Sequence, residues 1–207
     1  MNSINRQGNF LGAIPQVTRV ILILNVILFI VDLATRYIVR EFLALYSFNT
    51  GAFQPYQLVS HMFLHGSFGH IFFNMFGLYM FGKILESVLG SKRFFLLYFL
   101  SGLGAALLQL LIYQLQGSPA IMIGASGAIF GILAAFAMMF PNVELMIIFL
   151  PIPIKAKYIV PIYAVLELFF GIANFSKDNI AHFAHLGGAV VGFILIKIWK
   201  RNQFRIM

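Results

Sequence analysis

Long apolar stretches alternate along the chain with short polar connections. A helix of about 20 predominantly apolar residues crosses the hydrocarbon core of a membrane. The pattern therefore predicts an all-α polytopic membrane protein with six transmembrane helices. The expected helices lie near 18–35, 69–88, 94–115, 124–140, 158–174 and 180–198.

Composition supports this pattern. Of the 207 residues, 61% are hydrophobic and 10% are charged, whereas soluble domains carry about 25% charged residues. We predict one membrane domain over 18–198, between a short cytoplasmic N-terminal segment, 1–17, and a basic cytoplasmic C-terminal segment, 199–207. The residues before the first apolar helix lack the features of a signal peptide, so this helix is expected to remain as an anchor.

The distribution of charge predicts an orientation. The formal net charge is +8, but the basic residues lie in short connections and near the C-terminus, which argues against a nucleic-acid partner. With the N-terminus in the cytoplasm, three of the 14 basic residues fall outside: Arg36, Arg40 and Lys177. Because basic residues accumulate on the cytoplasmic side, we expect both termini there.

Two connections have features of their own. The segment 36–68 is rich in Phe and Tyr without a full-length apolar run, which predicts short helices lying in the membrane interface. The segment 141–157 is broken by three prolines, which predicts either an interfacial hairpin or helix ends on the inner side.

The first candidate for chemistry is Ser126, which lies in the run Gly124-Ala125-Ser126-Gly127 at the start of an apolar helix. Glycines beside a serine leave its hydroxyl uncrowded, as a nucleophile requires. The same glycines also suit close helix packing, since Gly127 and Gly131 form a small-xxx-small pair. Taken alone, the packing interpretation is favoured.

The histidines change this balance. All five lie in two regions: His61, His65 and His70, and His182 with His185. The predicted topology brings His70, Asn74, Ser126 and His185 to a similar depth on the outer side. Polar residues gathered at one depth of an apolar bundle indicate a functional site.

Glycine spacing predicts which of these residues meet. If the Gly188/Gly192 face packs against the Gly127/Gly131 face, His185 comes to lie against Ser126. An imidazole that accepts the serine proton makes the hydroxyl a competent nucleophile. His70 and Asn74 are four residues apart on one helix face. Their N–H groups, with the backbone N–H of Ser126, are candidate donors to an oxyanion.

These residues together resemble the rhomboid family of intramembrane serine proteases over about 54–195. The resemblance rests on His65, His70-x-x-x-Asn74, Glu86 followed by Gly90, Gly124-x-Ser126-Gly127 and Ala184-His185-x-x-Gly188-x-x-x-Gly192. It implies a six-helix core with an interfacial first external loop. It also implies a serine endopeptidase with Ser126 as nucleophile and His185 as base in a dyad, and with His70, Asn74 and the Ser126 backbone as the oxyanion hole.

The resemblance further implies transmembrane-anchored protein substrates, contact with membrane lipid, and no cofactor or metal. It fits the minimal prokaryotic form in an inner membrane and leaves the oligomeric state open. Two positions depart from the family pattern. Tyr56-Gln57 stands where many relatives have Trp-Arg, and Phe130 stands where some relatives carry a tyrosine that stacks on the catalytic histidine. A phenyl ring can still pack against His185 but offers no hydroxyl.

Other functions remain open at this stage. A non-catalytic binder of membrane segments is one alternative, although such relatives generally lack either the serine or the histidine. A metal- or haem-binding transporter is another, but the chain lacks a His-Glu-x-x-His helix and the paired histidines expected for haem.

Four residues are expected to have mainly structural roles. His61 and His65 should bond loop carbonyls, and His182 should serve packing or access. A hydrogen bond is favoured over a proton relay for Glu167, which lies in an apolar helix.

Overall fold

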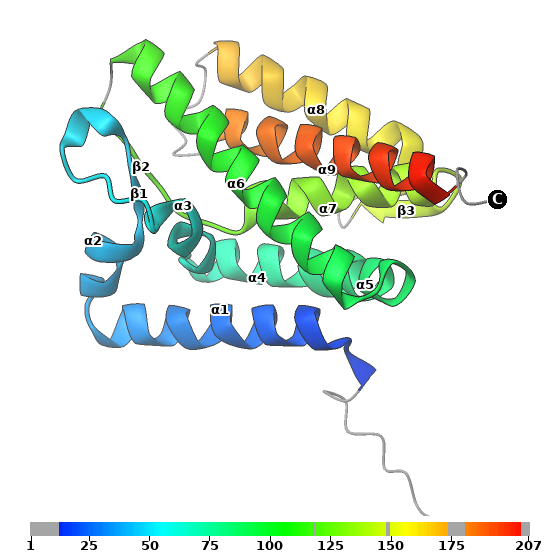
Figure 1. Ribbon diagram of the computed structural model, residues 1–207, viewed down its shortest axis with the longest axis horizontal. Coiled ribbons are helices and arrows are strands. Elements are labelled where there is room, and N and C mark those ends of the chain that lie inside the picture. The colour runs from blue at the N-terminus through cyan, green and yellow to red at the C-terminus, as the bar shows by residue number, and fades with distance from the viewer. Residues whose placement is uncertain (1–12, 118, 148–149, 174–180, 204–207) are drawn as a thin grey trace, which may run out of the picture.

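The computed structural model describes residues 13–117, 119–147, 150–173 and 181–203. These residues form a bundle of helices (Figure 1). The expected tails fall partly outside this range, because residues 1–12 and 204–207 are not described. The long helices are α1 (Gln16–Ala34), α6 (Ser91–Gln116), α7 (Ser126–Met139), α8 (Ala156–Ala173) and α9 (His182–Gln203).

The second predicted helix is a composite. It begins as α4 (Phe68–Gly77), passes through a π-helical segment, η4 (Leu78–Gly82), and continues as α5 (Lys83–Leu89). Among the described residues, four helices are long and apolar enough to cross a membrane: α1, the composite Phe68–Leu89, α6 and His182–Arg201 of α9. The predicted helical membrane bundle is therefore present. Helix α7 is apolar but shorter, and it packs with α8 against the others.

The first connection contains the expected short helices. These are α2 (Ile38–Leu43), η2 (Phe48–Thr50), α3 (Gln57–Ser60) and η3 (His61–Phe63). Buried Gln57 ties the segment together, since its side-chain oxygen accepts from the Gln54 backbone N–H at 3.0 Å and its amide donates to the carbonyls of Phe42 and Ala52. This residue belongs to the Tyr56-Gln57 pair that departs from the family pattern.

Two short antiparallel sheets were not part of the all-α prediction. Strand β1 (Leu45–Tyr46) pairs with β2 (Ile121–Met122) and joins the first connection to the segment that leads into α7. Strands β3 (Glu144–Ile147) and β4 (Leu150–Lys155) form a hairpin. Of the two structures predicted for 141–157, the hairpin is therefore the one observed. Prolines interrupt a helix and leave nearby backbone N–H and C=O groups without helical partners. Pairing of β3 with β4 provides hydrogen-bond partners for such groups.

Carboxylates fix both ends of α1. The Glu86 carboxylate accepts from the backbone N–H groups of Val17 and Thr18 at 2.9 and 2.7 Å, where the first turn of α1 has no internal partners. At the other end, Asp32 is buried and pairs with Arg40 at 2.7 Å. Arg40 also donates to the His65 carbonyl, so α1 holds the segment that precedes α4.

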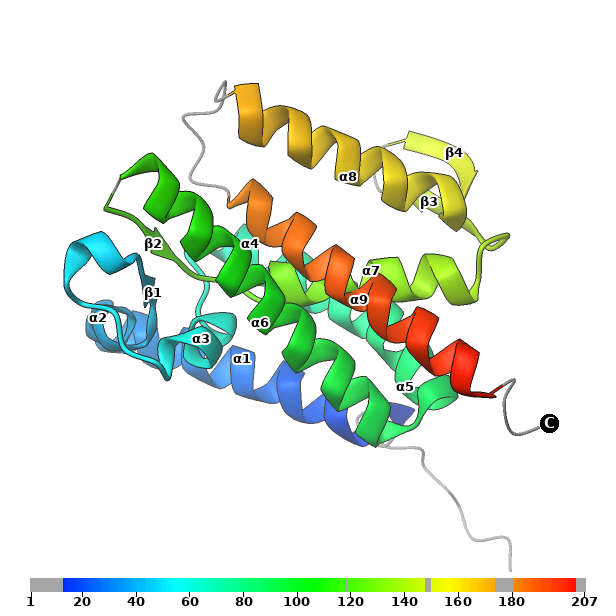
Figure 2. The ribbon, with the colours of Figure 1, turned by 45° about the horizontal axis from the view of Figure 1, so that its top comes forward.

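The centre of the bundle is the contact between α6, α7 and α9 (Figure 2). A Cβ on Gly188 would overlap the backbone of Gly127, and a Cβ on Gly192 would overlap the backbone of Gly131. The predicted packing of these two glycine faces is therefore confirmed. Because no side chain separates the helices, their backbones lie in direct contact.

This contact predicts a specific loss of stability. Gly188→Ala should reduce the free energy of unfolding by about 1–3 kcal/mol, the usual range for overpacking, because the added methyl group meets rigid backbone. The measurement is denaturant unfolding in detergent micelles. Gly69→Ala is the matched control, since a Cβ at Gly69 meets no atom within 4 Å. Equal stability of the two variants would contradict the packing described here.

Candidate active site

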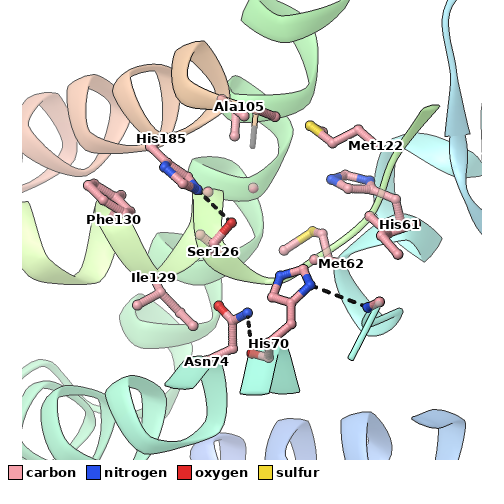
Figure 3. A pocket seen from close by; sticks show the side chains of 18 of the residues that line it. His61, Met62, His70, Asn74, Ala105, Met122, Ser126, Ile129, Phe130 and His185 are labelled. Carbon is pink, nitrogen blue, oxygen red and sulfur yellow. Dashed lines mark hydrogen bonds between the residues drawn. The ribbon is translucent and has the colours of Figure 1, made fainter. Parts of the chain in front are cut away.

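A cavity of about 820 Å³ opens between α4, α6, α7, α9 and the segment before α7. The four site residues predicted from the sequence all line it: His70, Asn74, Ser126 and His185 (Figure 3). The structure thus brings together side chains from three helices that are distant in sequence. Each of these side chains lies within the first two turns of its helix, at the same end of the bundle.

The shortest contact among these residues joins Ser126 and His185. The Nε2 atom of His185 lies 2.8 Å from the Ser126 Oγ (Figure 3). Ser126 is the first residue of α7, so its backbone N–H has no partner within the helix. The hydroxyl therefore lies beside both a potential proton acceptor and a backbone donor.

Neighbouring side chains hold the His185 ring in place. The Phe130 ring stacks on it with a centroid separation of 4.3 Å and an interplanar angle of 2°, as the sequence predicted. The first turn of α9 is held by Gln109 of α6, whose side-chain oxygen accepts from the Ala184 backbone N–H at 3.1 Å. The sequence did not reveal this role of Gln109, because α6 contains three glutamines and nothing in their spacing shows which one meets α9.

His70 presents a hydrogen-bond donor to the cavity. Ser67 caps α4 by accepting from the His70 backbone N–H at 3.1 Å. The Gly66 backbone N–H donates to the His70 Nδ1 at 3.3 Å, so Nδ1 is the acceptor and a neutral ring carries its proton on Nε2. This Nε2–H faces Gly124, the residue two positions before Ser126.

Gly124 requires the absence of a side chain for two reasons. Its φ is +126°, a conformation that residues with a Cβ rarely adopt. An added Cβ would lie 2.7 Å from the His70 Nε2 and 3.8 Å from the Ser126 Oγ. The glycine therefore keeps open the space between the imidazole donor and the serine hydroxyl.

Asn74 lies one turn beyond His70 and is buried. One amide N–H donates to the His70 carbonyl at 2.9 Å. An amide nitrogen carries two hydrogens, and no second hydrogen-bond partner of this nitrogen occurs within the part of the chain that the structure describes. Asn74 therefore retains one donor on the cavity side of α4 (Figure 3).

The outer histidines are neutral and have different surroundings. Burial lowers the pKa of His61 to about 4, although its bond to the Gln57 carbonyl at 2.7 Å acts in the opposite direction. Burial, and then the nearby His70, lower the pKa of His65 to about 3. The predicted carbonyl bond is present for His61. It was wrong for His65, whose ring nitrogens have no hydrogen-bond partner among the described residues and whose ring instead packs edge-on against His70.

Glu167 of α8 lies beside two histidines of α9. Its Oε2 atom is 2.6 Å from the His182 Nδ1 and 3.0 Å from the His185 Nδ1. The first contact is the structural hydrogen bond that the sequence predicted for Glu167. The second contact was not predicted, because the sequence does not give the rotation of α8 relative to α9.

Comparisons with known proteins identify the family of the chain. Residues 52–202 match the Rhomboid domain. The chain is 30% identical over 155 residues to "Rhomboid-like protein 11, chloroplastic" of Arabidopsis thaliana, covering 72% of this chain and 53% of that protein. It is 31% identical over 156 residues to "Rhomboid protein 1, mitochondrial" of Saccharomyces cerevisiae, covering 72% and 44%. The chain thus spans about half the length of these two relatives.

A bacterial relative matches over most of both chains. The protein named "Putative rhomboid protease YdcA" of Bacillus subtilis is 28% identical over 188 residues, covering 90% of this chain and 89% of its own length. The match to the Rhomboid domain takes in the composite second helix and every later helix, and hence all four site residues. The chain belongs to the rhomboid family.

Proposed function

We propose that the protein is an intramembrane serine endopeptidase that cleaves transmembrane-anchored proteins through a Ser126–His185 dyad. The observation that carries this proposal is the 2.8 Å contact between the Ser126 Oγ and the His185 Nε2 at the wall of a cavity. A nucleophile within hydrogen-bond reach of a base, which is itself held by further groups, has the arrangement needed for covalent catalysis.

The first step forms an acyl-enzyme. The Ser126 Oγ attacks the carbonyl carbon of the scissile peptide bond while the His185 Nε2 accepts the hydroxyl proton. The tetrahedral intermediate then collapses, and the protonated His185 gives its proton to the leaving amine. The stacked Phe130 ring restricts the imidazole to the plane in which its Nε2 faces the serine.

The oxyanion is stabilised by donors already directed at the cavity. The His70 Nε2–H, the remaining Asn74 N–H and the Ser126 backbone N–H come from α4 and from the start of α7. Fixed donors of this kind need no reorganisation when charge develops. Water that enters the cavity then attacks the acyl-enzyme, with His185 acting again as base.

We further propose that the bundle crosses the membrane with six helices, counting α7 and α8, and with both termini in the cytoplasm of a prokaryotic inner membrane. The first described residues and the end of α9 lie at the same end of the bundle (Figure 1), which supports an even number of crossings with both termini on one side. The excess of basic residues in the expected inner connections favours the cytoplasm as that side. The site residues lie toward the opposite, external end. The expected external residue Lys177 lies outside the described residues.

The central test uses the dyad itself. Ser126→Ala and His185→Ala should each abolish cleavage of a single-span reporter substrate in proteoliposomes, because each removes one partner of the proton transfer. A fluorophosphonate should label the wild-type protein at Ser126 and leave Ser126→Ala unlabelled. Ser87→Ala is the control, since its exposed hydroxyl only bonds the Lys83 carbonyl. A folded wild-type protein that neither cleaves nor labels would instead be a non-catalytic binder of membrane segments.

The oxyanion site is tested separately. Asn74→Ala should lower kcat by roughly 10- to 1,000-fold, the range for loss of one oxyanion donor. Labelling by the fluorophosphonate should slow as well, because its phosphonyl oxygen occupies the same position. A variant that cleaves at the wild-type rate would remove Asn74 from the mechanism.

A further inference from the structure

We propose that Glu167 is a positioning residue for His185, an inference that rests on the proposed protease function. The family resemblance implies a dyad without an acidic partner. In this chain, however, a carboxylate from α8 lies 3.0 Å from the His185 Nδ1, on the side of the ring opposite the Ser126 contact. Ser126, His185 and Glu167 thus form a continuous chain of polar groups across α7, α9 and α8.

The contact determines which ring nitrogen carries the proton. A carboxylate accepts hydrogen bonds, so it favours the tautomer of His185 with hydrogen on Nδ1. In that tautomer Nε2 has a free lone pair directed at the Ser126 Oγ, as a general base requires. With the opposite tautomer, Nε2–H would donate to the serine and could not accept its proton.

The Glu167–His185 contact is close but not aligned as a hydrogen bond. The two atoms are close enough for a hydrogen bond, but the His185 Nδ1–H direction departs from good alignment with the carboxylate. Catalytic hydrogen bonds in enzymes without substrate are often poorly aligned and tighten when substrate binds. The Glu167 side chain is 15% exposed and His185 is more buried, so the pair is largely shielded from water.

The charge of Glu167 also matches the reaction. Proton transfer from Ser126 leaves a positive imidazolium in an apolar bundle, and a nearby carboxylate stabilises that charge. The same Oε2 atom contacts the His182 Nδ1 at 2.6 Å. This second contact also joins α8 to α9, so a variant at His182 separates the effect of that link from the effect of the Glu167–His185 contact.

The test compares three variants. Glu167→Leu removes the acceptor and should lower kcat by about tenfold or more, since an unoriented base adopts the wrong tautomer. KM should stay within about twofold, because the contact faces away from the substrate cavity. Glu167→Gln retains an acceptor oxygen and should restore part of the lost rate. His182→Phe keeps the aromatic contact with Phe170 but removes the bond to Glu167, and it should cleave at close to the wild-type rate.

Nitrogen-15 NMR of histidine-labelled protein provides a readout that does not depend on cleavage. The wild-type His185 signal, assigned by its loss in His185→Ala, should show hydrogen on Nδ1, and Glu167→Leu should shift hydrogen to Nε2. An unchanged tautomer or an unchanged kcat in Glu167→Leu would overturn the inference. A fall in kcat of the same size in His182→Phe would also overturn it. The effect of Glu167→Leu would then come from loss of the link between α8 and α9 and not from the orientation of His185. If the wild-type protein does not cleave, the proposed function fails, whereas the NMR result still decides whether Glu167 orients His185.

Discussion

Direct contact between the backbones of α7 and α9 sets the geometry on which the candidate site depends. Gly188 and Gly192 meet Gly127 and Gly131 with no side chain between the helices. Helices in lipid gain little from hydrophobic burial, so close packing and polar contacts must hold them together. The short separation also determines where the first turns of both helices lie. Ser126 and His185 fall in those turns, and their 2.8 Å contact is a consequence of the packing.

The same constraint explains what the sequence could predict. Small residues four apart mark helix faces that approach closely, so the pairing of α7 with α9 followed from glycine positions alone. The ends of the helices were also close to those observed, as in α6, expected over 94–115 and found over Ser91–Gln116. The contact of Phe130 with His185 was expected from the family resemblance, in which some relatives have a stacking tyrosine at this position, and the structure shows the two rings stacked.

The sequence could not predict contacts that depend on how far a helix is rotated about its axis or shifted along it relative to its neighbour. Glycine spacing does not determine these two quantities for α6 and α8. Gln109 and Glu167 are polar residues flanked by apolar residues in their helices, which indicates a buried partner without identifying it. The bond of Gln109 to the first turn of α9 needs the observed offset of α6. The contact of Glu167 with His185 needs the observed rotation of α8. The prediction that His65 bonds a loop carbonyl was wrong for a similar reason. Its ring packs edge-on against the ring of His70, and the sequence pattern does not fix that placement.

Polar side chains in this bundle follow two different arrangements. Backbone groups occupy the hydrogen-bonding atoms of Gln57, and backbone N–H groups together with the hydroxyls of Thr18 and Ser91 occupy those of Glu86, so both residues stabilise helix ends and loops. At the cavity, by contrast, the Ser126 backbone N–H and one Asn74 N–H have no hydrogen-bond partner in the described part of the chain, and both residues line the cavity. An unpaired donor inside an apolar bundle is costly. Ser101 of α6 also has a hydroxyl without a partner among the described residues, away from the cavity, so the cost alone does not mark a site. The two donors at the cavity differ because they share it with the Ser126 hydroxyl and the His185 imidazole, which is the arrangement that the proposed acyl transfer requires for a developing negative charge.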